Sequence, residues 1–180
     1  KLSGGTIVAT VMSNLGLHKF CEENHLKLLC AAVGDRNVLE LMQKESMVLG
    51  GEQSGHIIFL EHMTTGDGQL AALQFLSILG QSGKKASELA GQITHYPQLL
   101  QNVKVGSNEE KTAILNSAEL AAIVAREEEK LAGHGRILLR ASGTEPLIRV
   151  MAEADTQDLA ESVVKTLVQA VENIQKILNK

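Results

Sequence analysis

The fold of the second half of the chain is decided by one stretch, RILLRASGTEPLIRVMAE at residues 136–153. Its two ends are apolar and its middle is rich in small, polar turn residues, which predicts two adjacent strands at residues 136–140 and 147–153. Residues 117–131 before the stretch and 156–178 after it repeat apolar side chains at helical spacing. An apolar run further upstream completes the order, so the sequence predicts a small α+β domain of β-α-β-β-α type.

The first half of the chain alternates short apolar runs with helical patterns, which is typical of an α/β layer with parallel pairing. We therefore predict a three-layer α/β domain with a mixed or parallel sheet, closed by a short helix near residues 87–93. Its strands are expected at residues 6–11, 26–33 and 56–60, and its main helices at residues 14–24, at residues 38–44 and after Thr65-Gly66-Asp67-Gly68.

We place the domain boundary after residue 101, which gives domains 1–101 and 102–180. There an apolar strand at residues 99–105 runs into a polar segment that starts at Gly106, and we expect a hinge at residues 101–106. Aspartates explain two of the expected helix starts: Asp155 is the predicted N-cap of the last helix. A single Asp in the glycine-rich run 64–68 likewise favours N-capping over a metal site.

Composition excludes several classes of partner. The 180 residues carry a formal net charge of −4, so no overall field attracts a polyanion. Aromatic residues make up 2% of the chain, too few for the stacking platforms of single-stranded nucleic-acid binders. No apolar run approaches membrane-spanning length. We expect neither a nucleic acid nor a membrane as partner. Because the chain starts at Lys1 directly ahead of a strand-like run, we interpret it as part of a longer protein.

The turn between the two strands of the opening stretch has the composition of a phosphate site. Arg140 ends one strand and Arg149 lies on the next, so both guanidinium groups can face the turn and bind phosphate through paired hydrogen bonds. Ser142 and Thr144 add hydroxyls, and Gly143 lets the backbone bend so that successive N–H groups converge on an anion. The alternative is an ordinary hairpin with solvated arginines.

Two segments of the first half have polar groups suited to a sugar. Glu52 and Ser54 follow a glycine pair and offer acceptors for hydroxyls, although an ordinary glycine-rich turn is an equal alternative. His56 titrates near neutral pH and can move protons to or from a sugar hydroxyl, or simply orient the loop. The Gly34-Asp35-Arg36 turn is either part of the same site or an Asp cap beside a surface arginine.

Together these motifs resemble the α-D-phosphohexomutase family. R-x-S-G-T-E-P-x-x-R at residues 140–149 resembles the phosphate-binding loop of its C-terminal domain, and G-E-x-S-G-H at residues 51–56 resembles the sugar-binding loop of its third domain. V-G-D-R at residues 33–36 is closer to the glucosamine-phosphate branch than to the mannose- or glucose-phosphate branches. The resemblance runs from Gly4 to about Glu153 and covers domains 3 and 4 of a four-domain enzyme, the latter TBP-like.

The resemblance implies an enzyme that interconverts glucosamine 6-phosphate and glucosamine 1-phosphate for UDP-N-acetylglucosamine synthesis in the bacterial cytoplasm. The reaction would pass through a phosphoserine and glucosamine 1,6-bisphosphate, which also serves as activator. The implied substrate-binding residues are Gly34, Asp35, Arg36, Glu52, Ser54 and His56, with His56 as candidate acid or base. The implied phosphate-binding residues are Arg140, Ser142, Gly143, Thr144 and Arg149.

The resemblance also indicates what lies elsewhere. The phosphoserine and the Mg²⁺ ligands belong to domains 1 and 2, so we expect no metal ligand in this chain, and this portion alone should not catalyse the reaction. The expected partners are a sugar phosphate and domains 1 and 2 of the same protein, with a homodimer as an open alternative. Other readings are a phosphomannomutase or phosphoglucomutase fragment, or a non-catalytic sugar-phosphate-binding module.

Overall fold

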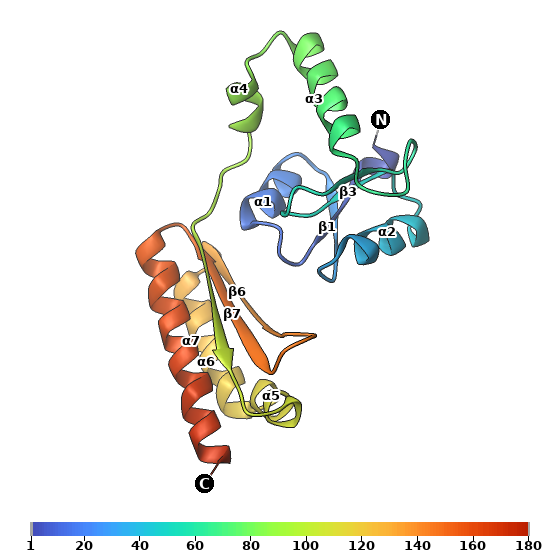
Figure 1. Ribbon diagram of the computed structural model, residues 1–180. Helices are drawn as coiled ribbons and strands as arrows, with labels where there is room; N and C mark the ends of the chain where they lie inside the picture. The colour runs from blue at the N-terminus through green and yellow to red at the C-terminus, as the bar shows by residue number, and fades with distance from the viewer. Residues whose placement is uncertain (1, 180) are drawn as a thin grey trace. The chain divides into compact units, whose positions relative to one another are not determined.

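The computed structural model describes residues 2–179 of the chain and divides it into two compact units, with the division between His95 and Tyr96 (Figure 1). The predicted boundary at residue 101 is therefore too late. It falls inside strand β5 (Gln98–Lys104), which pairs along its whole length with β7 (Leu147–Ala154) and so belongs to the second unit. Most of the segment expected to act as a hinge, residues 101–106, lies within this strand.

The first unit is built on a four-stranded sheet in the order β2-β1-β3-β4. A 3-10 turn at Ser3–Gly5 leads into β1, which pairs in parallel with β2 and β3, whereas β4 is antiparallel to β3. The predicted α/β class and mixed sheet are confirmed. The strands span Thr6–Thr10 (β1), Lys27–Ala31 (β2), Leu49–Gly51 (β3) and Ile57–Phe59 (β4).

Helices lie on both faces of this sheet. Helix α2 (Asp35–Lys44) covers one face, where Val38 and Met42 are fully buried against Val8 and Ile58. Over the other face, side chains of helices α1 (Leu15–Glu23) and α3 line an apolar pocket of about 660 Å³ together with residues of β1, β3 and β4. Along β4 the side chains alternate between the two layers: Ile58 packs with the residues of α2, whereas Ile57 and Phe59 line the pocket.

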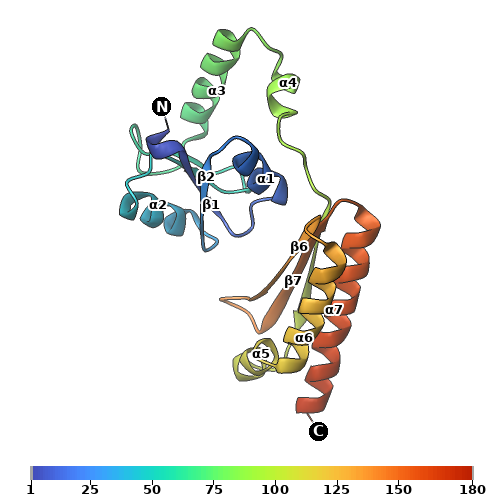
Figure 2. The ribbon, with the colours of Figure 1, turned by 180° about the vertical axis from the view of Figure 1, so that it is seen from behind.

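Helices α3 (Gly68–Ser82) and α4 (Ala86–Ala90) complete the first unit (Figure 2). Asp67 caps α3, because its carboxylate accepts hydrogen bonds from the backbone N–H groups of Gln69 and Leu70, as the sequence predicted. No residue of α3 is buried. Its exposed large apolar side chains are Leu73, Phe75, Leu76 and Ile78.

The second unit packs three helices against an antiparallel sheet in the order β5-β7-β6. Strand β7 is central, and its buried Ile148 and Val150 join Leu167 and Val171 of α7 in one core. The other elements are β6 (Gly135–Ala141), α5 (Asn108–Leu115), α6 (Ala118–Leu131) and α7 (Gln157–Leu178). Among residues 2–179, no helix is long and apolar enough to cross a membrane.

Two local predictions in this unit are wrong. The polar segment starting at Gly106 contains helix α5, which Ser107 caps by accepting a hydrogen bond from the backbone N–H of Glu110. The last helix is capped by Thr156, whose hydroxyl accepts from Leu159 N, and not by Asp155. Asp155 instead pairs with His134 Nδ1 at 3.0 Å. The small domain is therefore β-α-α-β-β-α.

Gly50 tests the packing of α2 on the first sheet. A Cβ at this position of β3 would lie 2.4 Å from Met42 Sδ and 3.0 Å from Val38 Cγ1, in a fully packed layer. We expect Gly50→Ala to lower the free energy of unfolding by about 1–3 kcal/mol, the usual cost of overpacking a core. Gly68→Ala is the control, because a Cβ there meets no atom within 4 Å. Urea denaturation that ranks the two variants equally would contradict this packing.

Candidate functional site

Two arginines lie directly opposite each other on β6 and β7, next to the loop that joins these strands. The antiparallel register of β6 and β7 pairs Arg140 with Arg149. The Nε atoms of both side chains are buried and have no hydrogen-bond partner, and neither guanidinium group forms an ion pair with any residue of the described chain. Burial, and then the charge of Arg149, lower the pKa of Arg140 from its usual value.

This arrangement is costly without a ligand. Like charges directly opposite each other on neighbouring strands are destabilising, and each buried donor left without a partner costs about 1–3 kcal/mol. Both costs disappear if an anion sits between the guanidinium groups, because it satisfies the donors and cancels the repulsion. The pair of arginines therefore has the electrostatics of an anion site and not of a solvated hairpin.

The loop between the two strands exposes its backbone beside these arginines. Ser142 is buried, and its hydroxyl accepts a hydrogen bond from Glu145 N at 3.3 Å. Ser142 thus braces the turn from inside. Gly143 and Thr144 are exposed, and within residues 2–179 no partner is found for either N–H. The loop therefore presents two free backbone donors.

The role of Gly143 differs from the one predicted. Its φ angle is not in the left-handed region, so the bend itself does not require a glycine, and the nest-type backbone we expected is absent at this position. A Cβ built on Gly143 meets no atom within 4 Å. The missing side chain instead leaves open space over the loop, which permits an anion to approach the backbone closely.

Lys111 of helix α5 contacts the same loop, and sequence reasoning missed it. Its buried ammonium group donates to the backbone oxygen of Ser142 at 2.7 Å and to that of Glu145 at 3.2 Å. The only available signal was indirect. The capping pattern of Ser107 and Glu110 would have predicted a helix that starts three residues before Lys111.

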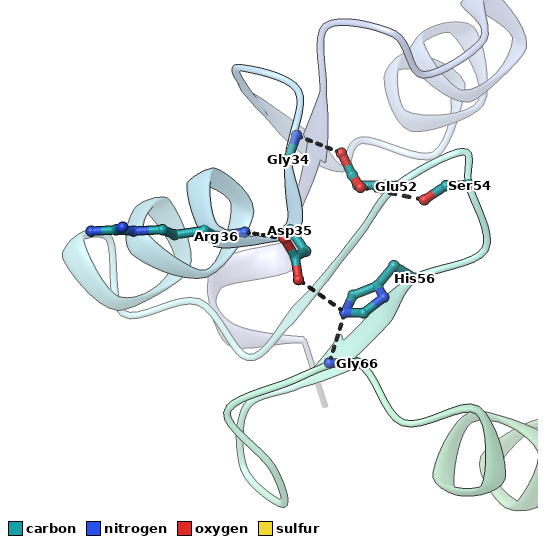
Figure 3. Close-up of polar contacts among 7 residues, drawn as sticks. All are labelled: Gly34, Asp35, Arg36, Glu52, Ser54, His56 and Gly66. Atoms are coloured by element: carbon teal, nitrogen blue, oxygen red, sulfur yellow. Dashed lines mark hydrogen bonds and ion pairs between the residues drawn. The ribbon is translucent and has the colours of Figure 1, made fainter. Parts of the chain in front are cut away.

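In the first unit, Glu52 connects two of the predicted segments (Figure 3). It stands at the end of β3, where the chain turns towards β4. Its Oε1 atom accepts a hydrogen bond from Gly34 N at 2.7 Å, and its Oε2 atom accepts one from the hydroxyl of Ser54 at 3.3 Å. The carboxylate therefore holds the turn before α2 against the β3–β4 hairpin. The sequence alone did not predict this connection.

His56 and Asp35 form a second polar contact between these segments. His56 Nε2 accepts a hydrogen bond from Gly66 N at 3.1 Å and lies 3.6 Å from Asp35 Oδ2. A ring nitrogen that accepts from an N–H is unprotonated, which assigns the proton of the neutral imidazole to Nδ1.

Gly66 was missed as part of this cluster, because its segment was interpreted only as a helix cap. A Cβ at Gly66 would lie 2.3 Å from the ring of His56, so the imidazole can sit against the backbone only where this position is glycine. Gly66 thus makes room for the imidazole ring, a role that no local sequence pattern predicted. It fixes one nitrogen of His56 and leaves Nδ1 for other contacts.

Arg36 does not join the other predicted residues. Its side chain is 87% exposed, pairs with Glu40 one helical turn away at 2.8 Å, and points away from Glu52 and His56 (Figure 3). The structure therefore places Asp35 and His56 together, and Gly34, Glu52 and Ser54 together, but leaves Arg36 on the surface of α2.

Across residues 2–179, no group of three or more His, Cys, Asp or Glu side chains lies close enough together to hold a metal ion. The described residues do not fit a magnesium site, and we assign no magnesium ligand to them.

Comparison with known proteins identifies the class. The model of phosphoglucomutase/phosphomannomutase alpha/beta/alpha domain III matches residues 1–96, and that of the phosphoglucomutase/phosphomannomutase C-terminal domain matches residues 100–170. The chain belongs to the phosphoglucomutase/phosphomannomutase family. The resemblance inferred from its motifs is confirmed.

Relatives about 50% identical to the chain have a more specific name than the family. The phosphoglucosamine mutase of Ligilactobacillus salivarius (strain UCC118) is 51% identical over 172 residues, which cover 96% of this chain and 38% of the relative. That of Pelotomaculum thermopropionicum (strain DSM 13744 / JCM 10971 / SI) is 50% identical over 173 residues, with the same coverage. The chain thus spans about 38% of the length of these relatives.

Solved structures agree on the fold. The N-acetylphosphoglucosamine mutase of Aspergillus fumigatus matches with a TM-score of 0.80 at 21% identity, over 94% of this chain and 38% of that one. The same enzyme in complex with GlcNAc-6P and magnesium matches with a TM-score of 0.78 at 21% identity, over 94% and 39% of the two chains. At this level of identity the likeness shows the fold alone.

The unpaired arginines generate a prediction for the protein without substrate. Inorganic phosphate should raise its melting temperature above that in chloride of matched ionic strength, because binding at ten times Kd stabilises the folded state by about 1.4 kcal/mol. Arg140→Gln should abolish this response, and without phosphate it should melt no lower than the unmodified protein, because the repulsion from Arg149 is removed.

The matched control is Arg126→Gln, an arginine of α6 whose side chain is 62% exposed. Its phosphate response should equal that of the unmodified protein. Equal responses in the Arg140 and Arg126 variants would show that phosphate does not act at the β6–β7 loop.

Proposed function

We propose that this chain is the sugar- and phosphate-binding portion of a phosphoglucosamine mutase, which interconverts glucosamine 6-phosphate and glucosamine 1-phosphate. The observation that carries the proposal is the register pairing of Arg140 with Arg149, whose buried Nε atoms lack partners. Two paired guanidinium groups match the geometry of a phosphomonoester. About 50% identity to relatives named phosphoglucosamine mutase supports the choice within the family.

The loop and the arginines would hold the phosphate that is not reacting. Arg140 and Arg149 supply charge, Gly143 and Thr144 supply exposed backbone donors, and the buried hydroxyl of Ser142 keeps the turn closed. None of these groups recognises the sugar ring, so the loop can accept a phosphate at either end of the substrate. A reaction that exchanges the 1- and 6-positions needs such a site, because the substrate must bind in two orientations.

The cluster in the first unit would bind the sugar. Glu52 and Asp35 supply a carboxylate to each of two neighbouring polar contacts, which suits hydroxyls and the ammonium group of a glucosamine phosphate. In the tautomer of His56 found here, Nδ1 carries the ring proton and cannot act as a base. We propose that in the substrate complex the ring proton lies on Nε2, which is 3.6 Å from Asp35 Oδ2, so that Nδ1 can accept the proton of the reacting hydroxyl. Removing that proton raises the nucleophilicity of the oxygen that accepts the phosphoryl group.

The remaining parts of the reaction would come from the rest of a longer protein. The proposal assigns the phosphoserine, the Mg²⁺ ligands and the first two domains to that part, in agreement with relatives of which this chain spans about 38%. Neighbouring structures are described in complex with magnesium and GlcNAc-6P, or with glucose 1,6-bisphosphate. We therefore propose Mg²⁺ and glucosamine 1,6-bisphosphate as cofactor and intermediate. We propose the bacterial cytoplasm as its location and UDP-N-acetylglucosamine synthesis as its purpose.

The proposal is tested by substrate preference of the full-length protein. Initial rates in coupled assays should give a kcat/KM for glucosamine 6-phosphate at least about tenfold above those for mannose 6-phosphate and glucose 6-phosphate, the effect of one hydrogen bond worth about 1.4 kcal/mol. Equal or better turnover of mannose 6-phosphate would assign the protein to a sibling branch. Tight sugar-phosphate binding without turnover of any of the three would favour a non-catalytic binding module.

His56 has its own prediction. Gln can still accept the hydrogen bond from Gly66 N, so His56→Gln should preserve the loop while removing the group that titrates. We expect kcat to fall by about 100-fold or more, as for loss of a general acid or base, with KM nearly unchanged. His62→Gln, at an exposed position of the same unit, serves as control. An unaltered kcat in the His56 variant would reduce His56 to a structural role.

A further inference from the structure

Lys111 is buried yet has no carboxylate partner. It is 7% exposed, and no ion pair joins its ammonium group to any acidic side chain in the part of the chain that the structure describes. Its two hydrogen bonds go to backbone oxygens, those of Ser142 and Glu145. Burying a charge is expensive unless it is compensated, so a lysine retained at this position calls for a role beyond packing.

The two bonds bracket the part of the loop that faces outward. Ser142 and Glu145 stand immediately before and after Gly143 and Thr144, whose N–H groups have no partner among residues 2–179. In a trans peptide the C=O of one residue and the N–H of the next point in opposite directions. When Lys111 holds the oxygen of Ser142, the N–H of Gly143 must point away from Lys111 and out of the loop.

The neighbouring contacts fix the helix that delivers this lysine. Ser107 caps α5 through Glu110 N, Glu110 in turn accepts hydrogen bonds from Gly106 N and from the side chain of Asn179, and Ile114 of the same helix is fully buried. At the other end of the loop, Val105 N donates to Pro146 O at 2.9 Å. The loop is therefore held from one side by α5 and by the end of β5.

We propose that Lys111 is a positioning residue of the phosphate site, which turns the Ser142–Gly143 peptide so that Gly143 N–H donates to a bound phosphate. Its charge also adds to the positive potential of Arg140 and Arg149. The proposal rests on the proposed phosphate-binding function of this loop. It assigns Lys111 no contact with the ligand, and it explains why an ammonium group is buried against carbonyls alone.

The test compares Lys111→Met, which keeps the length of the side chain but loses the donors, with Lys111→Arg, which keeps charge and donors. In the full-length protein, Lys111→Met should weaken binding of inorganic phosphate by about tenfold, the worth of one charge-assisted hydrogen bond, while Lys111→Arg should recover part of it. With ¹⁵N-labelled glycine, saturating phosphate should shift the amide resonance of Gly143 in the unmodified protein and not in Lys111→Met.

The outcomes separate the two proposals. If the unmodified protein binds phosphate and Arg149→Gln abolishes binding, but Lys111→Met binds as tightly as the unmodified protein, the role of Lys111 is refuted and the phosphate site stands. If the unmodified protein binds no phosphate, the proposed function of the loop fails. If Lys111→Met does not fold, the unmodified protein decides: a Gly143 resonance unmoved by saturating phosphate overturns the proposal.

Discussion

The register of β6 and β7 is the constraint on which the second unit's chemistry depends. It places Arg140 opposite Arg149, each with a buried Nε that no residue of the described chain satisfies. A shift of one residue would send one of the two side chains to the opposite face of the sheet, into the layer of α6 and α7. The same hairpin fixes the loop whose free N–H groups lie beside the arginines, so charge and backbone donors arrive together.

Holding two unpaired cations together requires a rigid support. The face of β7 opposite the arginines carries Ile148 and Val150, both fully buried against the long helix α7. Burial of such side chains stabilises a fold by about 1.5–3 kcal/mol each. A few such contacts offset the cost of the charge repulsion and of the unsatisfied donors next to the β6–β7 loop. The apolar core thus keeps the site ready for its ligand in the absence of that ligand.

The sequence predicted those parts of the fold that depend on local pattern. Alternating apolar runs predicted the α/β layer, and the turn residues at 142–146 predicted the β6–β7 hairpin. Strand β3 was missed because two of its three residues are glycines, which are depleted in strands. The structure shows why Gly50 is there: Met42 and Val38 occupy the space of a side chain. Helix α5 was missed because its first turn is polar, although its capping pattern was readable.

The candidate site was predictable only where motif and geometry coincide. The residues of the phosphate loop follow one another in sequence, so a hairpin alone brings them together. The contacts of Glu52 with Gly34, and of His56 with Gly66, join positions 18 and 10 residues apart that no periodicity links. Lys111 lies 31 residues from the carbonyl it holds.

These unpredicted contacts share one feature: each connects a backbone amide group to a side chain from another segment. Glu52 accepts from Gly34 N, His56 accepts from Gly66 N, and Lys111 donates to Ser142 O. Every such bond fixes the orientation of a peptide plane, and with it the direction of the neighbouring backbone donor or acceptor. In both units, side chains therefore orient loop backbone, and glycine occupies the positions where that backbone must be approached closely.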